Sequence, residues 1–339
     1  MNVLTAPPAP VRDRRLDLDR AKGVAILIVV VGHIVAAEPP RGAEWYDTLR
    51  YAIYRFHMPF FLYLSGYVMV LSGALRTTDA QLPRYAWRRA QRLLVPFLLL
   101  GTVVLVGKLV AQRFVHVDNR PGGLLDGLRD LVLTTEDSPA TFIWFLWVLF
   151  LCCVVAPPVW RRLGTMGLVA GGLVLLALEP PAIAYLDRFA RHAVFFAIGV
   201  AVAEREARLL PLFAARQPLW WLVFAAALAA AIAGWLPGDW SLLLCGLAAI
   251  PALHGLMFTA PLLRQSWPLT LGRYTMAIYL FNVIAIGVAK AILMKMGVPW
   301  TAEGFWIHAP VLTAAGLIGP ILGKAMVLRR LPVLDRMTD

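Results

Sequence analysis

The sequence predicts an all-α protein, a polytopic transmembrane helix bundle of about ten spans. Two features of the composition predict this fold class. Of the 339 residues, 60% are apolar and only 15% are charged, whereas a soluble domain is about half apolar and a quarter charged. The charged residues also gather between long apolar runs, and a run of about 20 apolar residues is long enough to cross a bilayer as a helix.

Ten apolar segments fit this description, and mostly short polar connections join them. The expected spans are residues 16–37, 51–73, 93–111, 140–160, 163–179, 185–203, 219–236, 240–262, 269–293 and 306–328. They are predicted to form a single transmembrane domain, residues 16–330. Residues 1–15 include a Pro-rich stretch and are predicted to be a disordered cytoplasmic N-terminus, and residues 331–339 a short cytoplasmic tail.

Lysine and arginine are distributed unequally between the two sets of connections. If the N-terminus is cytoplasmic, the inner segments hold 21 of these residues, the outer segments hold 8, and three lie within spans. Because cytoplasmic segments of membrane proteins are enriched in Lys and Arg, this bias predicts that both termini are cytoplasmic. The bias also accounts for the net charge of +12. The sequence contains no compact basic domain that would indicate nucleic-acid binding.

The first span carries polar residues along one helical face. Lys22 and His33 are eleven residues apart, which is nearly three helical turns and about 16 Å. Asp19 lies one turn before Lys22, and Gly32 beside His33 permits close approach of another helix or a ligand. Ionisable groups are costly inside a membrane, so they usually face the protein interior and have a function. The alternatives are that Lys22 snorkels to the interface and that His33 is a structural hydrogen-bond partner.

The same segment has features of a cleaved signal peptide. Basic residues precede its apolar run, and Val35-Ala36-Ala37 resembles a cleavage site. His33 inside the run and Asp17 and Asp19 in the basic stretch are unusual in a leader. A retained first span is therefore the preferred interpretation.

Polar groups also occur near the outer end of the second span. Arg55 and His57 lie five to seven residues inside it, at about the depth expected for His33. Pro59 follows and interrupts the backbone hydrogen bonds, which leaves groups that a ligand could use. Polar packing between helices is the alternative for both side chains.

Arginines mark the inner end of the third span. Arg89 and Arg92 share a helical face, and Arg88 is adjacent. Planar guanidinium groups suit the binding of phosphates. The alternative is an ordinary cluster of positive charges on the cytoplasmic side.

Other polar residues within spans carry weaker indications. In the sixth span, Arg188, Arg191 and His192 are close in sequence and are expected to cluster on one side of the helix, where they could contact a substrate or pair structurally. His254 and Asn282 are single polar groups, for which interhelical hydrogen bonds are expected. The three cysteines, Cys152, Cys153 and Cys245, are interpreted as packing residues, and no residues have the spacing of a metal site.

Several of these stretches together resemble the integral-membrane acyltransferase-3 family, and within it the fucose 4-O-acetylase-like branch. The matching motifs are Asp19, Lys22-Gly23 and Gly32-His33, then Phe56-His57-Met58-Pro59-Phe60-Phe61 through Ser65-Gly66-Tyr67, then Arg89-x-x-Arg92 before Leu-Leu-Val-Pro-Phe, and Trp144-Phe145-Leu146. A later element, residues 271–280, is a weaker match. The family commonly ends that element with His, where this chain has Asn282. Either that His is not needed for chemistry or the acceptor site is modified.

The resemblance implies a membrane-bound O-acyltransferase, most simply an O-acetyltransferase, that is a multi-pass protein of the plasma (inner) membrane. It implies acyl-coenzyme A, acetyl-CoA in the simplest case, as the co-substrate on the cytoplasmic side, with no tightly bound cofactor. The acceptor would be a hydroxyl of a carbohydrate or glycoconjugate. The lipid bilayer is the remaining partner, and no nucleic acid or metal is expected.

The family also implies roles for individual residues. His33 would act as the general base, and His57 would orient His33 or hold the thioester. Lys22 would bind the donor or anchor the helix, and Asp19 would orient Lys22. A covalent acyl-histidine stays open as an alternative. The donor is expected at Arg88, Arg89, Arg92 and Trp144, and the acceptor at Arg55, Arg188, Arg191 and His192.

A transporter or exporter of a sugar-containing or lipid-linked substrate is the main competing function. Such a protein would also need many spans and buried charges. Transporters often show internal repeats and paired broken helices. The sequence shows neither, and its polar residues are concentrated in the first third. A non-catalytic receptor would not require the Lys–His face, Arg55 and the Arg pair together.

Overall fold

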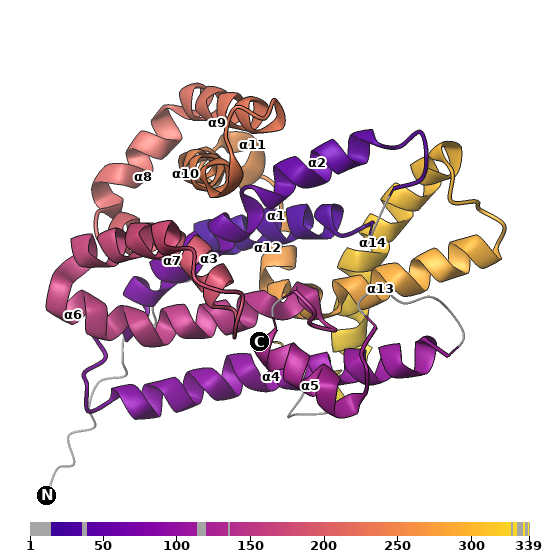
Figure 1. Ribbon diagram of the computed structural model, residues 1–339. Helices are drawn as coiled ribbons and strands as arrows, with labels where there is room; N and C mark the ends of the chain where they lie inside the picture. Colours follow the sequence, from indigo (N-terminus) through magenta and orange to yellow (C-terminus); the bar gives the residue numbers. More distant parts are fainter. Residues whose placement is uncertain are drawn as a thin grey trace, which may run out of the picture.

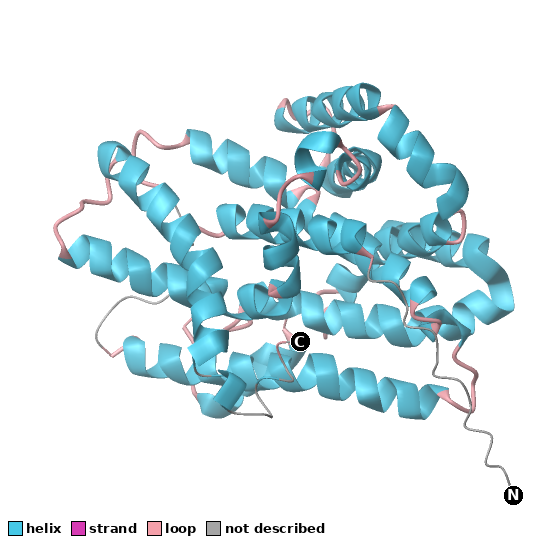
Figure 2. Ribbon diagram, turned by 180° about the vertical axis from the view of Figure 1, so that it is seen from behind, coloured by secondary structure: helices cyan, strands magenta, loops and turns pink. Residues whose placement is uncertain are grey.

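The computed structural model describes residues 15–35, 39–113, 120–134, 136–326 and 328–330, together with Asp335 and Thr338. In this part of the chain, α-helices dominate and there is no β-strand (Figure 1). The view from behind, coloured by secondary structure, likewise shows only helices and loops among the described residues (Figure 2). The predicted all-α class is confirmed. Except for Arg15, the predicted disordered N-terminus lies outside the described residues, and so does most of the predicted tail.

Fourteen α-helices follow one another within the described residues. Their bounds are α1 Leu16–Gly32, α2 Trp45–Tyr54, α3 His57–Leu71, α4 Leu82–Ala111, α5 Leu124–Leu133, α6 Trp144–Leu178, α7 Leu186–Ala203, α8 Glu206–Ala215, α9 Gln217–Ile232, α10 Gly238–Leu256, α11 Ala260–Leu263, α12 Trp267–Arg273, α13 Thr275–Lys295 and α14 Ala302–Met326. Short 3-10 turns occur at Ala74–Arg76, Thr141–Ile143 and Leu328–Arg330. Each of the ten predicted spans is occupied by at least one helix.

Five helical segments of the described chain are long and apolar enough to cross a membrane. They are Leu82–Ala111, Thr141–Leu178, Gly238–Leu256, Thr275–Lys295 and Ala302–Met326. A sixth is obtained if α8 and α9, which are bent by 82° at their junction, count as one span. The remaining predicted spans fall on α1, α3 and α7, which are shorter or carry more charge. The protein is thus a membrane protein by family and helix composition, and the number ten stays a prediction.

The longest helical segment contains the break that was expected between the fourth and fifth spans. Within α6, Gly164 has φ 65° and ψ −171°, a conformation that does not continue a helix and that favours glycine. Arg161 and Arg162 precede this break. The element is therefore two helices, consistent with the two predicted segments 140–160 and 163–179.

Helix α1 lies in the interior of the bundle, and short backbone contacts position it. Ala21, Ile26, Val29 and Val30 are completely or almost completely buried. Near the start of α1, a Cβ atom on Gly272 of α12 would lie 1.9 Å from the carbonyl oxygen of Asp19, so only glycine permits this crossing. This packing makes α1 part of the folded domain, in keeping with the preferred interpretation of a retained first span.

Contacts between helix ends and connections agree with the two sides to which the sequence assigned them. Segments assigned to one side meet one another, through Arg15 with Glu206, Arg161 with Thr77, Trp160 with Glu204, and Arg329 with Tyr274. Segments assigned to the other side also meet, through Trp45 with Trp306, Tyr185 with Ser138, and Arg191 with Asp239. We call these the inner and outer ends. Their assignment to cytoplasm and exterior stays a prediction.

Candidate functional site

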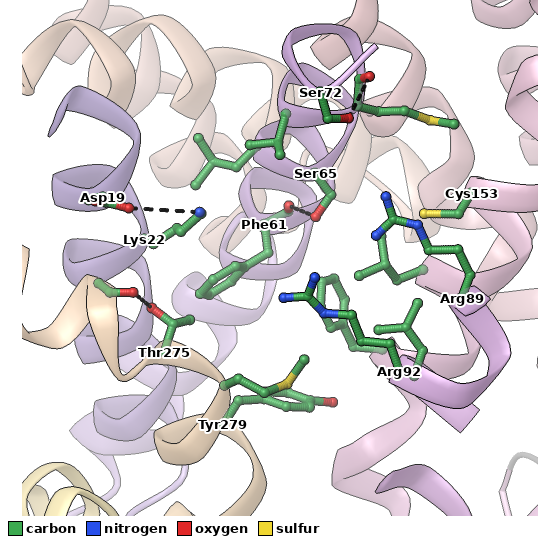
Figure 3. Close-up of a pocket in the computed structure, with 18 of the residues that line it drawn as sticks. Asp19, Lys22, Phe61, Ser65, Ser72, Arg89, Arg92, Cys153, Thr275 and Tyr279 are labelled. Atoms are coloured by element: carbon green, nitrogen blue, oxygen red, sulfur yellow. Dashed lines mark hydrogen bonds and ion pairs between the residues drawn. The ribbon is translucent and has the colours of Figure 1, made fainter. Parts of the chain in front are cut away.

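A pocket of about 590 Å³ lies among the helices. Its walls come from α1, α3, α4, α6, α12 and α13, so distant parts of the chain meet there (Figure 3). Along α3 it extends from Met58 near the outer end to Ser72 at the inner end. That length of helix corresponds to a depth of about 21 Å. We call this space the donor pocket.

Basic side chains gather at the inner end of the donor pocket. Its charged lining residues are Lys22, Arg89, Arg92, Arg273 and a single acidic residue, Asp19. The Lys22 ammonium lies 3.9 Å from the Asp19 carboxylate, as the i,i+3 spacing predicts. Figure 3 shows Lys22 on one side of the space and Arg89 and Arg92 on the other. An excess of cations around a cavity favours an anionic ligand, and guanidinium groups favour phosphate.

The opposite, deep end of the donor pocket is apolar. It is lined by Met58, Phe61, Phe145 and Tyr279. Met58 directly follows His57, and Phe145 directly follows Trp144. Since neighbours along a helix are 1.5 Å apart in rise, the deep end lies at nearly the same depth as His57 and Trp144, which belong to a group of polar residues at the outer half of the bundle.

That group contains three histidines from three helices, and we call it the histidine cluster. His33 ends α1, His57 begins α3, and His192 lies in α7. His33 and His192 both lie close enough to His57 to interact with it electrostatically. Tyr54 lies between two of them, with ring centroids 6.1 Å from His33 and 5.1 Å from His57. Trp144 packs on His192 at 4.8 Å.

The tautomers of two of these histidines follow from their hydrogen bonds. His57 Nδ1 lies 2.8 Å from the Ile53 carbonyl oxygen, and His192 Nδ1 lies 2.8 Å from that of Arg188. Because a carbonyl oxygen only accepts, each Nδ1 carries the proton and donates it. In the neutral ring, Nε2 is then left as an acceptor. Both rings are fixed and nearly buried, with 6% and 5% of their surface exposed.

His33 differs from the other two histidines. It is partly exposed, whereas they are buried. Its Nδ1 makes no hydrogen bond of standard geometry among the described residues, and neither does Oδ1 of Asn282, although the two side chains lie close enough to interact. The Asn282 amide is already engaged, since it donates to the Ile278 and Tyr279 carbonyls at 2.8 Å. A buried polar atom without a partner costs about 1–3 kcal/mol, so such atoms are expected where a ligand completes the bonding.

A comparison with models of known protein families shows to which family the chain belongs. A family model described as "Acyltransferase domain" matches residues 15–324. The chain belongs to the acyltransferase-3 family. The resemblance inferred from the motifs is thereby confirmed, and the match extends well beyond them into the last helix.

Two curated relatives share about half of their length with this member of the acyltransferase-3 family. Nodulation protein NolL of Sinorhizobium fredii is 29% identical over 200 residues, which are 58% of this chain and 50% of the relative. Nodulation protein NolL of Mesorhizobium japonicum is 27% identical over 202 residues, with the same coverage. The chain therefore spans about half the length of the curated relatives it matches. No solved structure matches it.

The structure brings together most of the residues that the sequence singled out. Asp19, Lys22, Arg89 and Arg92 line the donor pocket. His33, His57 and His192 meet in the histidine cluster, and Arg188 lies over the Trp144 ring at 5.6 Å from its centroid. Trp144, expected along the donor's path, is therefore in the outer group and contacts residues expected for the acceptor.

Three predicted site residues lie away from these two groups. Arg88 is exposed and does not line the donor pocket. Arg55 stacks on Tyr51 at 4.3 Å and donates to Ser241 Oγ at 3.2 Å, so it packs towards α10. Arg191 pairs with Asp239 at 3.1 Å. The Asp239 carboxylate therefore gives Arg191 the partner that structural pairing requires.

Sequence reasoning missed two residues that the structure adds. Arg273 is the fourth cation of the donor pocket, and Tyr54 links His33 with His57. Arg273 had a usable signal, since it follows Gly272 in the late family element at an inner end. Tyr54 had none, because its proximity to His33 depends on how α1 and α2 pack.

A separate polar network joins the inner ends of several helices. Arg15 bridges Asp17 and Glu206 at 2.9 Å each, and Tyr67 donates to the same Glu206 carboxylate. Burial raises the pKa of Glu206, but the Tyr67 and Arg15 bonds outweigh it and lower that pKa overall. Nearby, the His254 ring hydrogen-bonds to the Tyr63 hydroxyl at 2.5 Å, which is the interhelical bond expected for His254.

Proposed function

We propose that the protein is a membrane-bound O-acyltransferase that moves an acyl group, most simply acetyl, from acyl-CoA to a hydroxyl of a carbohydrate or glycoconjugate. One observation carries the proposal. The donor pocket has four cations at its inner end, and at its deep end Met58 directly follows His57, one of three clustered histidines, among which His33 Nδ1 makes no hydrogen bond of standard geometry within the described residues. The family match supports acyl transfer as the reaction class.

The inner end of the donor pocket suits the phosphates of coenzyme A. Arg89, Arg92, Arg273 and Lys22 would bind them, and guanidinium groups can do so with paired hydrogen bonds. The thin pantetheine arm would follow the apolar wall of α3 towards Met58. Under this proposal the thioester would lie at the deep end of the donor pocket, where Met58 directly follows His57. We propose that Asp19 orients Lys22 from its position 3.9 Å away.

The chemistry follows from the histidines. His33 takes the proton of the acceptor hydroxyl as its oxygen attacks the thioester carbonyl carbon. A C–O bond forms, the C–S bond breaks, and the proton passes from His33 to the leaving thiolate, which gives an ester and free coenzyme A. His57, held with Nε2 as an acceptor, is a positioning residue for His33 or the hydroxyl. A histidine suits both proton transfers because its ordinary pKa is about 6.5.

The acceptor would bind at the outer side of the cluster. Arg188 and His192 offer polar contacts there, and the Trp144 ring offers a flat apolar surface. Sugars present both hydroxyls and apolar faces, so such a combination suits a carbohydrate. With the donor on the cytoplasmic side and the acceptor on the outside, the protein would be a multi-pass protein of the plasma (inner) membrane.

The decisive experiment uses the purified protein in detergent with its His33→Ala variant. Binding and slow hydrolysis of radiolabelled acetyl-CoA are measured for both. The wild type should bind and hydrolyse the donor, while the variant should bind it with hydrolysis reduced about 100-fold or more, since general-base catalysis contributes about that much. His33→Gln serves as a second variant, because Gln keeps a polar side chain but cannot take a proton. If neither the wild type nor the variants bind the donor while folded, the acyltransferase proposal fails and a transporter becomes the leading hypothesis.

A further inference from the structure

Three aromatic rings from three helices line the deep end of the donor pocket. Phe61 belongs to α3, Phe145 to α6 and Tyr279 to α13. The ring centroid of Phe145 lies 6.0 Å from that of Phe61 and 5.6 Å from that of Tyr279, so the rings form a continuous contact. All three are nearly buried. We call them the aromatic layer.

The aromatic layer lies between the cations and the histidine cluster. Its three rings line the donor pocket, whereas none of the three clustered histidines does. Phe61 follows His57 by about one turn of α3, and Phe145 directly follows Trp144. A donor bound by its phosphates at the inner end therefore reaches this layer with its acyl end first.

Side chains on the far side of the layer, towards the histidine cluster, are buried. His57 is 6% exposed and Asn282 is 1% exposed. The layer itself is held in place, since the Tyr279 hydroxyl donates to the Phe142 carbonyl at 2.8 Å. In a tightly packed interior, extra methylene groups force neighbouring side chains off their positions and are unfavourable. A short acyl group would fit at the layer, and a long one would collide with it.

We propose that the aromatic layer of Phe61, Phe145 and Tyr279 restricts the donor to short acyl groups. The inference rests on the proposed function. It identifies the part of the molecule that selects the length of the acyl chain. The layer acts on the acyl group alone, because the cations that would bind the coenzyme lie at the other end of the pocket.

The test compares acetyl-CoA with hexanoyl-CoA as donors for the purified full-length protein. The measured quantity is the ratio of hexanoyl-CoA to acetyl-CoA turnover, which is insensitive to the fraction of active protein. Phe145→Ala and Phe61→Ala should raise this ratio about tenfold or more, the effect expected for relieving a clash with one or more methylene groups. Phe145→Leu, a milder change, should raise it less and provides a variant that folds more readily.

Leu149→Ala is the matched control. Leu149 lies one turn inward from Phe145 on the same wall, so this change also enlarges the pocket but not at the layer. Its ratio should equal that of the wild type. The inference is overturned if the wild type uses both donors equally, or if the Phe variants keep the wild-type ratio. A wild type that neither binds nor turns over acetyl-CoA would instead refute the proposed function, and this inference with it.

Discussion

At the scale of single residues, Arg88 and Arg89 show how one step along a helix separates a pocket residue from a surface residue. Arg89 lines the donor pocket and donates from Nε to the Tyr85 hydroxyl at 3.0 Å. Arg88 is exposed and outside the pocket. Helical periodicity placed Arg89 and Arg92 on one face. Charge alone, however, made Arg88, Arg89 and Arg92 equal candidates for binding the donor.

This pair supplies a controlled prediction for donor binding. Arg89→Gln should weaken acetyl-CoA binding about tenfold, because a charge-assisted hydrogen bond contributes about 1.5–3 kcal/mol. Arg88→Gln removes the same charge one residue away and should change the dissociation constant less than about twofold. Equilibrium binding of radiolabelled donor measures both. Equal losses in the two variants would show that general positive charge, and not the pocket, binds the donor.

What the sequence could predict at this scale depended on local spacing. Asp19 and Lys22 were placed correctly relative to each other because one regular helix carries both. Arg191 was ambiguous because its partner Asp239 is 48 residues away. The unpartnered atoms of His33 and Asn282 were not predictable at all, since they depend on the packing of α1 against α13.

At the scale of elements, the crossing of α1 and α12 positions one wall of the donor pocket. Asp19 and Lys22 on α1 face Arg273 on α12, and Gly272 beside it allows the two backbones to touch. Small residues often serve this purpose where membrane helices meet. The crossing therefore couples the stability of the bundle to the placement of three of the charged pocket residues.

A substitution at this crossing should reveal that coupling. Gly272→Ala would bring a Cβ atom to 1.9 Å from the Asp19 carbonyl oxygen, so the helices must separate. We expect a loss of about 1–3 kcal/mol in stability, seen as a lower melting temperature, and weaker acetyl-CoA binding. Gly287→Ala in α13, where nothing lies within 4 Å of the added atom, should leave both unchanged. Unchanged behaviour of Gly272→Ala would argue against the close crossing.

The network around Glu206 joins α1, α3 and α8 at the inner end and should make stability depend on pH. The folded protein lowers the Glu206 pKa below its ordinary value of 4.5. The carboxylate's contribution is therefore complete above about pH 4.5 and is lost as the pH falls through the lowered value.

Melting temperatures from about pH 6 down to about pH 3.5 test this dependence. The wild type should be more stable than Glu206→Gln at the upper end, and the difference should shrink as the pH falls. Arg205→Gln, which changes the adjacent exposed residue, should not reproduce this pattern. A constant difference between the wild type and Glu206→Gln would contradict the assignment.

At the scale of the whole molecule, hydropathy predicted where helices occur and charge predicted which connections meet. Segments sorted to one side by their Lys and Arg content do contact one another, as Arg15 and Glu206 show. The 82° bend between α8 and α9 was not predicted, because α8 falls in the connection between the predicted spans 185–203 and 219–236, where no helix was expected. The break between α2 and α3 was also not predicted. It lies inside the predicted span 51–73, and it places Tyr54 at the histidine cluster.

The aromatic layer has a consequence for kinetics. It lies between the donor pocket and the histidine cluster, so under the proposed function the donor and the acceptor would approach His33 from opposite faces of the bilayer. Neither substrate could then occupy the binding place of the other, and steady-state rates should show no mutual competition. The coenzyme would stay on its own side while the acyl group crosses, so the free energy of the thioester would drive a one-way flow of acyl groups through the membrane.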